Sequence, residues 1–551
     1  MAIVEVVLVL VGACIGFALL ARRLQVPYAA VLVLGGMALA FIPGLPEIRL
    51  NPELALAFFL PPLLQASAFR TDWRGFRRNL RPILLLALGC VLFTALCVAA
   101  AAKWLLPDLP WAAAIALGAI VAPPDAVAAS AILQRLRLPR RIVTVLEGES
   151  LVNDASALVL YRFALVAVAA GSVSLNGVLL SFLLIAAGGV AVGYALGRGA
   201  VWLMSRLEEP LLETALSFLV CYASFLGAEA IHVSGVIAVV TTGLVLGQAQ
   251  HLAMGPRTRL ASRTVWDFLE FILNSLIFLL IGLQLNRILD HLAGWPWTAL
   301  AGHALVIAAT LILSRFLWVF PATWLPRLIP AVRRQDPEPS WRHATVISWA
   351  GMRGVVSLAA ALALPEAFPQ RDLIVFLAFT GILATLVLQG TTLEWVILRL
   401  GVTLPQHDGG INPEEAEGRR LAAAAALTEI ERRLDDPLEG AMAADLVAEF
   451  RSRAERLSRT AANRGAAAAE RASRRRLRLA ALEAARLRLR QHHAAGHLTD
   501  EALVKLTQEL DLEELRVRQV LGDERTEAER AAEERARRQR ALPLLALPPH
   551  A

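Results

Sequence analysis

The chain has 551 residues, of which 57% are hydrophobic and 18% charged, and its mean hydropathy is +0.56. A soluble protein of this size would carry about a quarter charged residues. The net charge of +7 arises within residues 1–404, which hold 28 Lys and Arg against 21 Asp and Glu. Because these charges are spread over short loops between apolar segments, a basic nucleic-acid-binding protein is excluded. The four cysteines lie in apolar stretches, which excludes a secreted disulfide scaffold.

Thirteen apolar stretches precede residue 404, each near the ~20 residues that a helix needs to cross the hydrocarbon core. In chain order they are 2–20, 28–45, 52–69, 82–102, 110–133, 142–170, 174–203, 211–231, 233–249, 265–285, 297–325, 343–364 and 373–399. The first has an acidic residue, Glu5, where a signal peptide has basic ones, so we expect it to stay in the membrane. The sequence therefore predicts an all-α polytopic membrane protein.

Basic residues alternate between the loops on the two sides of these stretches. One set of loops holds 19 Lys and Arg, and the other set holds four. Cytoplasmic loops retain basic residues. The asymmetry predicts a multi-pass protein of the cell membrane, with its N-terminus outside and its C-terminus in the cytoplasm.

The composition changes at Leu404-Pro405, after which the chain is rich in Ala, Arg, Glu and Leu. Such strong helix formers, with charges of both signs interspersed, predict long helices. The predicted domains are a transmembrane domain, residues 1–404, and a charged helical cytoplasmic tail of regulatory character, residues 405–551. A partly disordered polar tail before Gly496 is the alternative.

Ionisable residues inside apolar spans are the strongest functional signal, because each costs at least about 2.5–3.5 kcal/mol to insert. The fifth, sixth and twelfth stretches contain Asp125, Glu147, Glu149, Asp154 and Arg353. At 100° per residue, Glu147, Ser150 and Asp154 share one helical face, while Glu149 and Asn153 share another. The opposite charges of Glu149 and Arg353 favour a structural ion pair. We interpret the remaining charged span residues as packing or interface residues: Glu5, Asp267, Glu270, His303 and Arg315.

Pro123 and Pro124 directly precede Asp125. They remove two backbone donors, which predicts that the fifth helix unwinds there. Such a break is tolerated at membrane depth only where protein or a water-filled cavity satisfies the freed backbone groups. Gly351 and Gly354 create a second weak point in the twelfth stretch. Breaks at corresponding positions of two halves are typical of an inverted repeat.

Asp154 lies about 18 Å from the start of its span at 1.5 Å per residue, which is near the bilayer midplane. A carboxylate in a low-dielectric site must take a proton or a cation, because desolvation disfavours its charged form. Competition between the two for Asp154 would produce exchange. Asn153 is neutral, so one proton would exchange for one monovalent cation without net charge movement. A purely structural network of Asp125, Asp154 and Arg353 is the alternative.

Four segments resemble one known family, the electroneutral sodium/proton exchanger branch of the monovalent cation:proton antiporters. They read EGESLVNDASALV, VSGVIAVVTTGLVLG, FLEFILNSLIFLLIGLQL and GMRGVVSLAAALALP, in that order along the chain. The tail segment HLTDEALVKLTQELDLEELRV is similar to the tails of bacterial members.

The resemblance implies that Asp154 binds the competing cation and proton, with Asp125 and Ser150 as ligands or supports. It implies that Asn153 shapes the site without titrating, and that Glu149 and Arg353 form an ion bridge. It also implies a homodimeric transporter without a cofactor or an enzymatic activity. Such a transporter moves Na+, or Li+ or K+, against H+ and serves pH and salt homeostasis.

Two positions depart from the family pattern. Many members have Thr or Ser where this chain has Pro124, and many have an acidic residue where it has Gln65. Both changes remove potential cation ligands, so a potassium/proton antiporter remains an alternative. The other rivals are a cation channel, a sensor subunit and an intramembrane aspartyl protease. The protease would be expected to carry a Gly-x-Gly-Asp element, which neither Asp125 nor Asp154 has.

Overall fold

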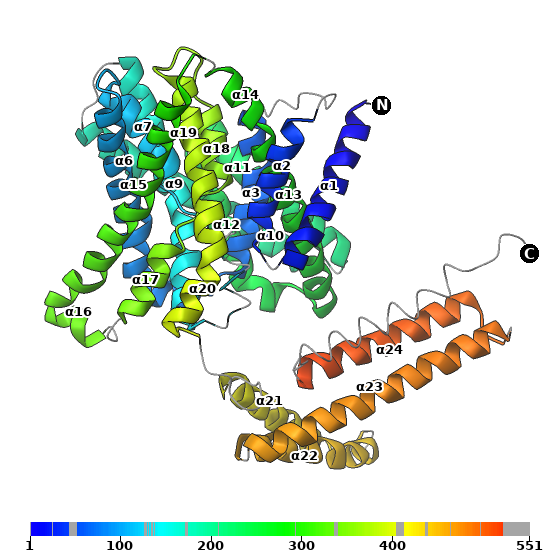
Figure 1. Ribbon diagram of the computed structural model, residues 1–551. Helices are drawn as coiled ribbons and strands as arrows, with labels where there is room; N and C mark the ends of the chain where they lie inside the picture. Colours follow the sequence, from blue (N-terminus) through cyan, green and yellow to red (C-terminus); the bar gives the residue numbers. More distant parts are fainter. Residues whose placement is uncertain are drawn as a thin grey trace, which may run out of the picture. The chain divides into compact units, whose positions relative to one another are not determined.

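A computed structural model describes residues 2–24, 26–42, 52–125, 129, 132–133, 136, 138–170, 175–207, 209–292, 294–335, 340–403, 413–435, 439–462, 464–495 and 497–521. Within these residues the chain forms helices and connecting turns and contains no strand (Figure 1). The predicted all-helical class is confirmed. The chain divides into two units, 1–404 and 405–551, at the point where its composition changes.

Most helices in the first half of the membrane unit follow the predicted apolar stretches. The helices of this half are α1 (Ala2–Leu24), α2 (Tyr28–Ala40), α3 (Pro52–Arg70), α4 (Trp73–Arg78), α5 (Leu80–Leu84), the π-helical turn η1 (Leu85–Cys90), α6 (Val91–Leu105), α7 (Trp111–Val121) and α9 (Arg140–Ala170). From α5 through η1 to α6 the chain runs on as one apolar helix.

The second half of this unit begins with four long helices. They are α10 (Leu175–Met204), α11 (Pro210–Ala230), α12 (Gly235–Ala253) and α13 (Pro256–Leu283). Then follow α14 (Leu285–Asp290), α15 (Trp297–Trp324), the 3-10 turn η2 (Leu325–Leu328), α16 (Pro330–Gln335), α17 (Trp341–Trp349), α18 (Val355–Leu362), α19 (Arg371–Ala384), the π-helical turn η3 (Thr385–Gln389) and α20 (Gly390–Leu400).

Eight helices of the described residues are long and apolar enough to cross a membrane by themselves. Helices α2 and α7 are apolar but shorter. Helices α7, α17 and α18 are short, because each is followed or preceded by a non-helical segment. Most of the later part of the fifth predicted stretch lies outside the described residues. The count of thirteen spans stays a prediction.

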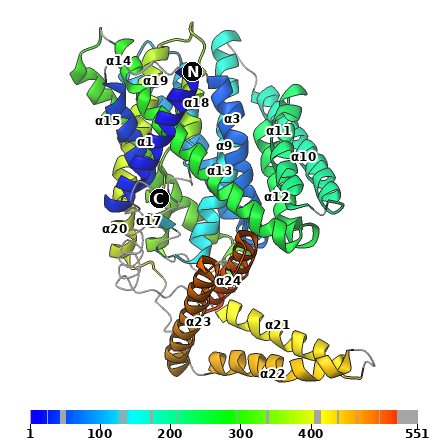
Figure 2. The ribbon, with the colours of Figure 1, turned by 90° about the vertical axis from the view of Figure 1, so that its right-hand side faces the viewer.

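The helices of the membrane unit pack in two groups, and Figure 2 shows α10, α11 and α12 of one group beside one another. In one group, α2 packs against α13, and α12 packs against α3, α10 and α11. In the other, α6 packs against α7 and α15, and α15 packs against α17 and α19. Helix α9 contacts α7 as well as α3 and α12, so it touches both groups. The residues of α9 are therefore placed where the two groups meet.

Glycines allow the closest helix approaches. A Cβ on Gly282 of α13 would lie 2.2 Å from the backbone oxygen of Val33 in α2. A Cβ on Gly118 of α7 would lie 2.2 Å from the backbone oxygen of Ala95 in α6. Small residues at such contacts are typical of membrane helices, whose association depends on close backbone packing.

The second unit contains the helices α21 (Pro413–Arg432), α22 (Gly440–Ala462), α23 (Arg464–Ala494) and α24 (Asp500–Leu521). Helix α21 packs against α22, and α23 packs against α24. Arg486 of α23 forms ion pairs with Asp511 and Glu514 of α24. The Thr499 hydroxyl accepts a hydrogen bond from the Ala502 backbone N–H at 3.2 Å and so caps α24.

Candidate cation and proton site

Two interrupted helices meet in the membrane unit. Helix α7 ends at Val121, and residues 122–125, which include Pro123 and Pro124, are not helical. The chain is also not helical from Ala350 to Gly354, between α17 and α18. The Asp125 backbone N–H donates to the Met352 carbonyl at 2.7 Å. This bond joins the two breaks and satisfies backbone groups that the interruptions free.

Arg353 holds the carboxyl ends of the interrupted helices. Its Nε donates to the Val121 carbonyl at 2.7 Å, and its Nη1 donates to the Gly351 carbonyl at 2.5 Å. Its backbone N–H donates to the Thr385 hydroxyl at 3.1 Å. A cation at a helix carboxyl end is favourable, because the orphan carbonyls there carry partial negative charge. Arg353 thus stabilises the crossing, by which we mean the place where the two interrupted helices meet. Its side chain is 1% exposed.

A cavity of about 420 Å³ opens beside the crossing and is lined by α2, α3, α9, α13 and both breaks. Asp125, Ser150 and Asp154 all line it. Asp154 is 9% exposed, and the Asp125 carboxylate acts on it electrostatically. A Cβ on Gly354 would lie 1.9 Å from Asp125 Oδ2. The glycine therefore makes room for the Asp125 carboxylate.

Helix α9 presents different residues to the cavity and to the neighbouring helices. Glu147, Ser150 and Asp154 line the cavity. Asn153 is fully buried, and its Nδ2 donates to the Pro124 carbonyl at 2.7 Å. This is the division of faces expected from helical spacing. Of the four residues predicted at the site, Asp154, Asp125 and Ser150 line the cavity together, whereas Asn153 joins α9 to the first break through its hydrogen bond.

The ion pair predicted between Glu149 and Arg353 is wrong in its basic partner. Arg315 of α15 donates from Nη1 and Nη2 to the two Glu149 carboxylate oxygens at 2.6 and 2.8 Å. Both side chains are 1% exposed. The third donor of Arg315, Nε, bonds the Ile347 carbonyl at 3.1 Å. Arg353 donates its hydrogen bonds to carbonyls at the helix ends. Glu149 therefore pairs with Arg315, whose guanidinium forms two hydrogen bonds to the carboxylate.

Arg315, which was expected to be a packing or interface residue, therefore supports the site through Glu149. The signal that could have found it is the one that selected Arg353, namely a charge inside an apolar span. Both arginines flank Gly351: a Cβ there would lie 2.5 Å from Arg315 Cδ and 3.3 Å from Arg353 Nη1. Arg315 of α15 and Arg353 of the second break thus lie close to each other, and sequence spacing alone does not show which of them pairs with Glu149.

Charged residues line the open end of the cavity. Arg70 of α3 donates from Nη1 to Asp267 Oδ1 of α13 at 3.0 Å and from Nη2 to Glu270. Asp267 and Glu270, which were expected to be packing or interface residues, therefore belong to the cavity mouth together with Arg263. Five acidic residues and two arginines line the cavity among the described residues. This excess of negative charge attracts cations.

Neutral polar side chains complete the lining, and the sequence analysis did not single them out. They are Tyr28, Ser67, Asn274 and Ser357. Neutral groups inside apolar spans are common, so their composition alone does not mark a site. Only the packing of α2, α3, α13 and α18 shows that they face the cavity.

Gln65 takes no part in the described lining of the cavity. Its side chain is 1% exposed, and Nε2 donates to the Ser217 carbonyl of α11 at 2.7 Å. It therefore joins α3 to α11. Of the two departures from the family pattern, only Pro124 lines the cavity.

Comparisons with known proteins identify the family of the chain. Residues 6–399 match the family described as sodium/hydrogen exchanger, transmembrane. The Na(+)/H(+) antiporter ApNhaP of Aphanothece halophytica is 35% identical over 381 residues, which are 69% of this chain and 70% of that protein. A sodium, potassium, lithium and rubidium/H(+) antiporter of Bacillus pumilus is 36% identical over an alignment of 376 positions that covers 65% of this chain and 56% of that protein.

The fold also matches a solved structure, that of the sodium proton antiporter MjNhaP1 from Methanocaldococcus jannaschii. The TM-score is 0.56 at 21% sequence identity, and the match covers 73% of this chain and 99% of that one. The family match extends over nearly the whole membrane unit and includes both breaks and the cavity. The chain belongs to the sodium/hydrogen exchanger family of multi-pass cation/proton antiporters, and is a transporter rather than an enzyme.

Proposed function

We propose that the chain exchanges one Na+ for one H+ by competition at the Asp154 carboxylate. The strongest support is the position of this carboxylate, which is 9% exposed at a cavity beside two broken helices. A carboxylate removed from water is not stable as an isolated anion, so it binds a proton or a cation. Binding of either ion excludes the other, and this exclusion couples the two fluxes.

Oxygen ligands for the cation are available around Asp154. Asp125 supplies a second carboxylate, Ser150 supplies a hydroxyl, and Pro123 and Pro124 bring backbone carbonyls to the lining. Hard cations prefer oxygen ligands. Asp154 and Asp125 would hold the transported cation directly, with Ser150 as a further ligand or support. We take Na+ as the main cation and K+ and Li+ as the competitors to rank, because the Bacillus relative is named for several alkali cations.

The charges around the site support electroneutral exchange. Glu149 and Arg315 cancel each other in their ion pair. Arg353 lies in the second break and carries a charge opposite to that of Asp125 in the first, and the Asn153 amide adds no charge. The site is then neutral when Asp154 carries either a proton or a monovalent cation, and negative when it is empty. Because a bare charge inside the membrane is costly, the two loaded forms would cross equally well and the empty form poorly.

The same proposal includes thirteen spans in an inverted repeat, an outside N-terminus, a cytoplasmic regulatory tail and a homodimer in the cell membrane. Arg70 and Arg263 at the cavity mouth belong to the loop set with 19 basic residues. With that set in the cytoplasm, the cavity opens inward. An exchanger with this orientation would serve pH and salt homeostasis.

Purified protein in proteoliposomes tests the proposal. We expect Na+ to dissipate an imposed pH gradient in the wild type and not in Asp154→Asn. Asp290→Asn is the matched control, because it makes the same chemical change at an exposed aspartate at the end of α14. Parallel additions of Na+, Li+ and K+ rank the cations. Cation-dependent proton movement that survives in Asp154→Asn would refute the assignment of the site.

A further inference from the structure

One hydroxyl group in the wall of the Asp154 cavity lacks a hydrogen-bond partner. Ser357, the third residue of α18, lines the cavity, and its side chain is 1% exposed. Its Oγ is buried and forms no hydrogen bond with the residues that the structure describes. Such atoms are rare in native proteins, because an unpaired buried polar atom destabilises the fold. The fold therefore leaves the Ser357 hydroxyl without a structural role.

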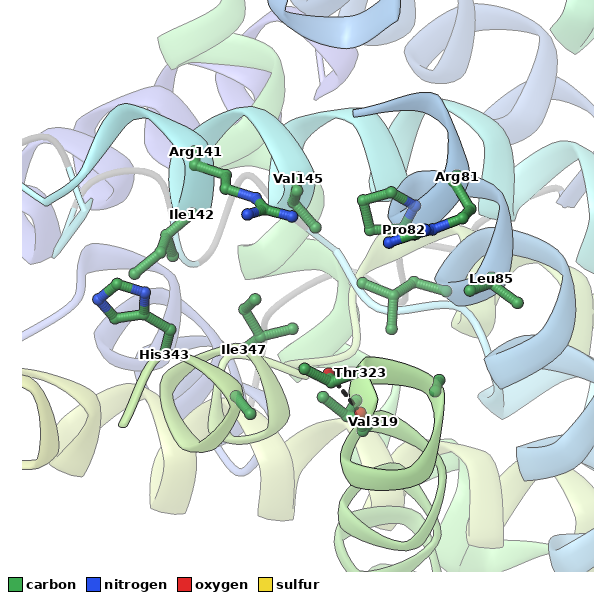
Figure 3. A pocket seen from close by; sticks show the side chains of 13 residues that line it. Arg81, Pro82, Leu85, Arg141, Ile142, Val145, Val319, Thr323, His343 and Ile347 are labelled. Carbon is green, nitrogen blue, oxygen red and sulfur yellow. Dashed lines mark hydrogen bonds between the residues drawn. The ribbon is translucent and has the colours of Figure 1, made fainter. Parts of the chain in front are cut away.

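The break before α18 explains why the usual partner is missing. A serine or threonine hydroxyl inside a helix commonly donates to the carbonyl three or four residues earlier. In a second cavity of the membrane unit, of about 220 Å³, Thr323 Oγ1 donates in this way to the Val319 carbonyl at 2.6 Å (Figure 3). The residues three and four positions before Ser357 are Gly354 and Arg353, and both belong to the non-helical segment. The Ser357 hydroxyl therefore stays available for a ligand.

Ser357 lies one helical turn from the residue that the Asp125 carboxylate contacts. A Cβ on Gly354 would lie 1.9 Å from Asp125 Oδ2, so this carboxylate lies directly against the start of α18. Residues three positions apart on a helix share a face. Gly354, Ser357 and Asp125 all line the cavity. The unpaired hydroxyl and the Asp125 carboxylate thus belong to the same part of the cavity wall.

The absence of a partner does not by itself indicate a ligand. Ser275 of α13 is 0% exposed, and its Oγ also has no partner within the described part of the chain. Ser275 is not among the described residues that line the cavity. What distinguishes Ser357 is that its unpaired hydroxyl lies in the wall of the cavity that contains Asp125 and Asp154. Ser275 is therefore a matched control for Ser357.

The backbone that carries Ser357 is held in place by the crossing. The Arg353 backbone N–H donates to the Thr385 hydroxyl at 3.1 Å, and its Nε donates to the Val121 carbonyl at 2.7 Å. These bonds fix the segment that leads into the first turn of α18. A ligand on a rigid support favours ions of one size, because it cannot follow a larger or smaller ion.

We propose that the Ser357 hydroxyl oxygen is a ligand of the transported cation and contributes to the choice among alkali cations. This inference rests on the proposed exchange at Asp154. Hard cations bind oxygen ligands, and a hydroxyl adds a ligand without changing the net charge of the site. A smaller ion approaches an oxygen more closely and is held more strongly by it. Loss of the hydroxyl should therefore weaken the binding of Li+ and Na+ more than that of K+.

Transport by the full-length protein in proteoliposomes tests the ligand role. Ser357→Ala removes the hydroxyl of the cavity, and Ser275→Ala removes an unpaired buried hydroxyl elsewhere. We expect Ser357→Ala to raise the apparent KM for Na+ at least about fivefold, with a larger factor for Li+ and a smaller one for K+, and to leave the maximal rate within about twofold. Ser275→Ala should match the wild type. An unchanged KM in Ser357→Ala, or a KM raised by the same factor for all three cations, would overturn the proposal.

Thermal unfolding of the purified protein in detergent separates a ligand from a structural hydroxyl. Without Na+, Ser357→Ala should unfold at no lower temperature than the wild type, because it removes an unpaired buried group. A cation that binds only the folded protein stabilises it by mass action. Added Na+ should therefore raise the unfolding temperature of the wild type and of Ser275→Ala more than that of Ser357→Ala. A structural role predicts the reverse, namely a lower unfolding temperature without Na+ and an equal shift with it, and this result would contradict the ligand role.

Asp154→Asn, measured beside these variants, separates failure of this inference from failure of the proposed exchange. Cation-dependent proton movement that persists in Asp154→Asn would refute the exchange and the ligand role together. Proton movement that is lost in Asp154→Asn, with wild-type KM values in Ser357→Ala, would leave the exchange intact and overturn the role of Ser357 alone. We expect loss in Asp154→Asn and the graded increase of KM in Ser357→Ala.

Discussion

The Glu149–Arg315 pair is the buried interaction whose loss should destabilise the protein most. Both side chains are 1% exposed, and two hydrogen bonds of 2.6 and 2.8 Å join them. Removing one partner of a buried pair leaves the other charge without compensation and costs about 3–5 kcal/mol. We therefore expect Arg315→Gln and Glu149→Gln each to lower the free energy of unfolding by about this amount.

The double variant Glu149→Gln/Arg315→Gln leaves no uncompensated charge. It should be more stable than the sum of the single changes predicts, with a coupling energy of about 2–3 kcal/mol. A second cycle with Glu149→Gln and Arg353→Gln should give less than about 1 kcal/mol, since Arg353 bonds backbone carbonyls instead.

Unfolding in detergent with increasing sodium dodecyl sulfate, followed by circular dichroism, measures these free energies. The six proteins of the two cycles share one protocol, so systematic errors of the extrapolation cancel. A larger coupling energy for Glu149 with Arg353 than with Arg315 would refute the assigned pair. It would restore the ion bridge that the family resemblance implied.

Three further changes test other parts of the site. Gly354→Ala would push its Cβ against Asp125 Oδ2; we expect at least about tenfold slower Na+-dependent transport. Gly199→Ala, which meets no atom within 4 Å, is its control, and equal rates would contradict the close approach. Asn153→Asp should make any remaining transport respond to the membrane potential, measured as current on supported membranes; transport without current would argue against it. Gln65→Met should lower the free energy of unfolding by about 1–3 kcal/mol, because a thioether cannot donate a hydrogen bond to the Ser217 carbonyl. An unchanged unfolding curve would contradict this reasoning.

The sequence was sufficient for the helices because apolar runs of spanning length leave little choice of secondary structure. It also located both interruptions. Pro123 and Pro124 remove donors, and residues 122–125 are not helical. Gly351 and Gly354 bracket the second non-helical segment. Each interruption arises from residues at the break itself, so the local sequence is sufficient to predict it.

The partners of buried charges depend on packing between distant segments. Glu149 and Arg315 are separated by 166 residues. Nothing in the local sequence shows whether Arg315 or Arg353 is the partner of the Glu149 carboxylate. The crossing decides the outcome, because it turns Arg353 toward the Val121 and Gly351 carbonyls.

Residues outside the charged motifs were also beyond the reach of the sequence. Gln65 stands near a conspicuous Pro-Pro-Leu-Leu run, yet its side chain bonds α11 rather than facing the cavity. Tyr28 and Asn274 line the cavity without belonging to any charged motif.

Competition between Na+ and H+ at one carboxylate is tested most directly by the pH dependence of the apparent KM for Na+. Wild-type protein in proteoliposomes, with the membrane potential clamped, is measured at several pH values on both sides of the membrane. A single shared site predicts that acidification raises KM, approaching about tenfold per pH unit, while the maximal rate stays constant, because only the deprotonated carboxylate binds the cation. A KM that is independent of pH, with a maximal rate that changes, would show that proton and cation occupy separate sites and would contradict the account.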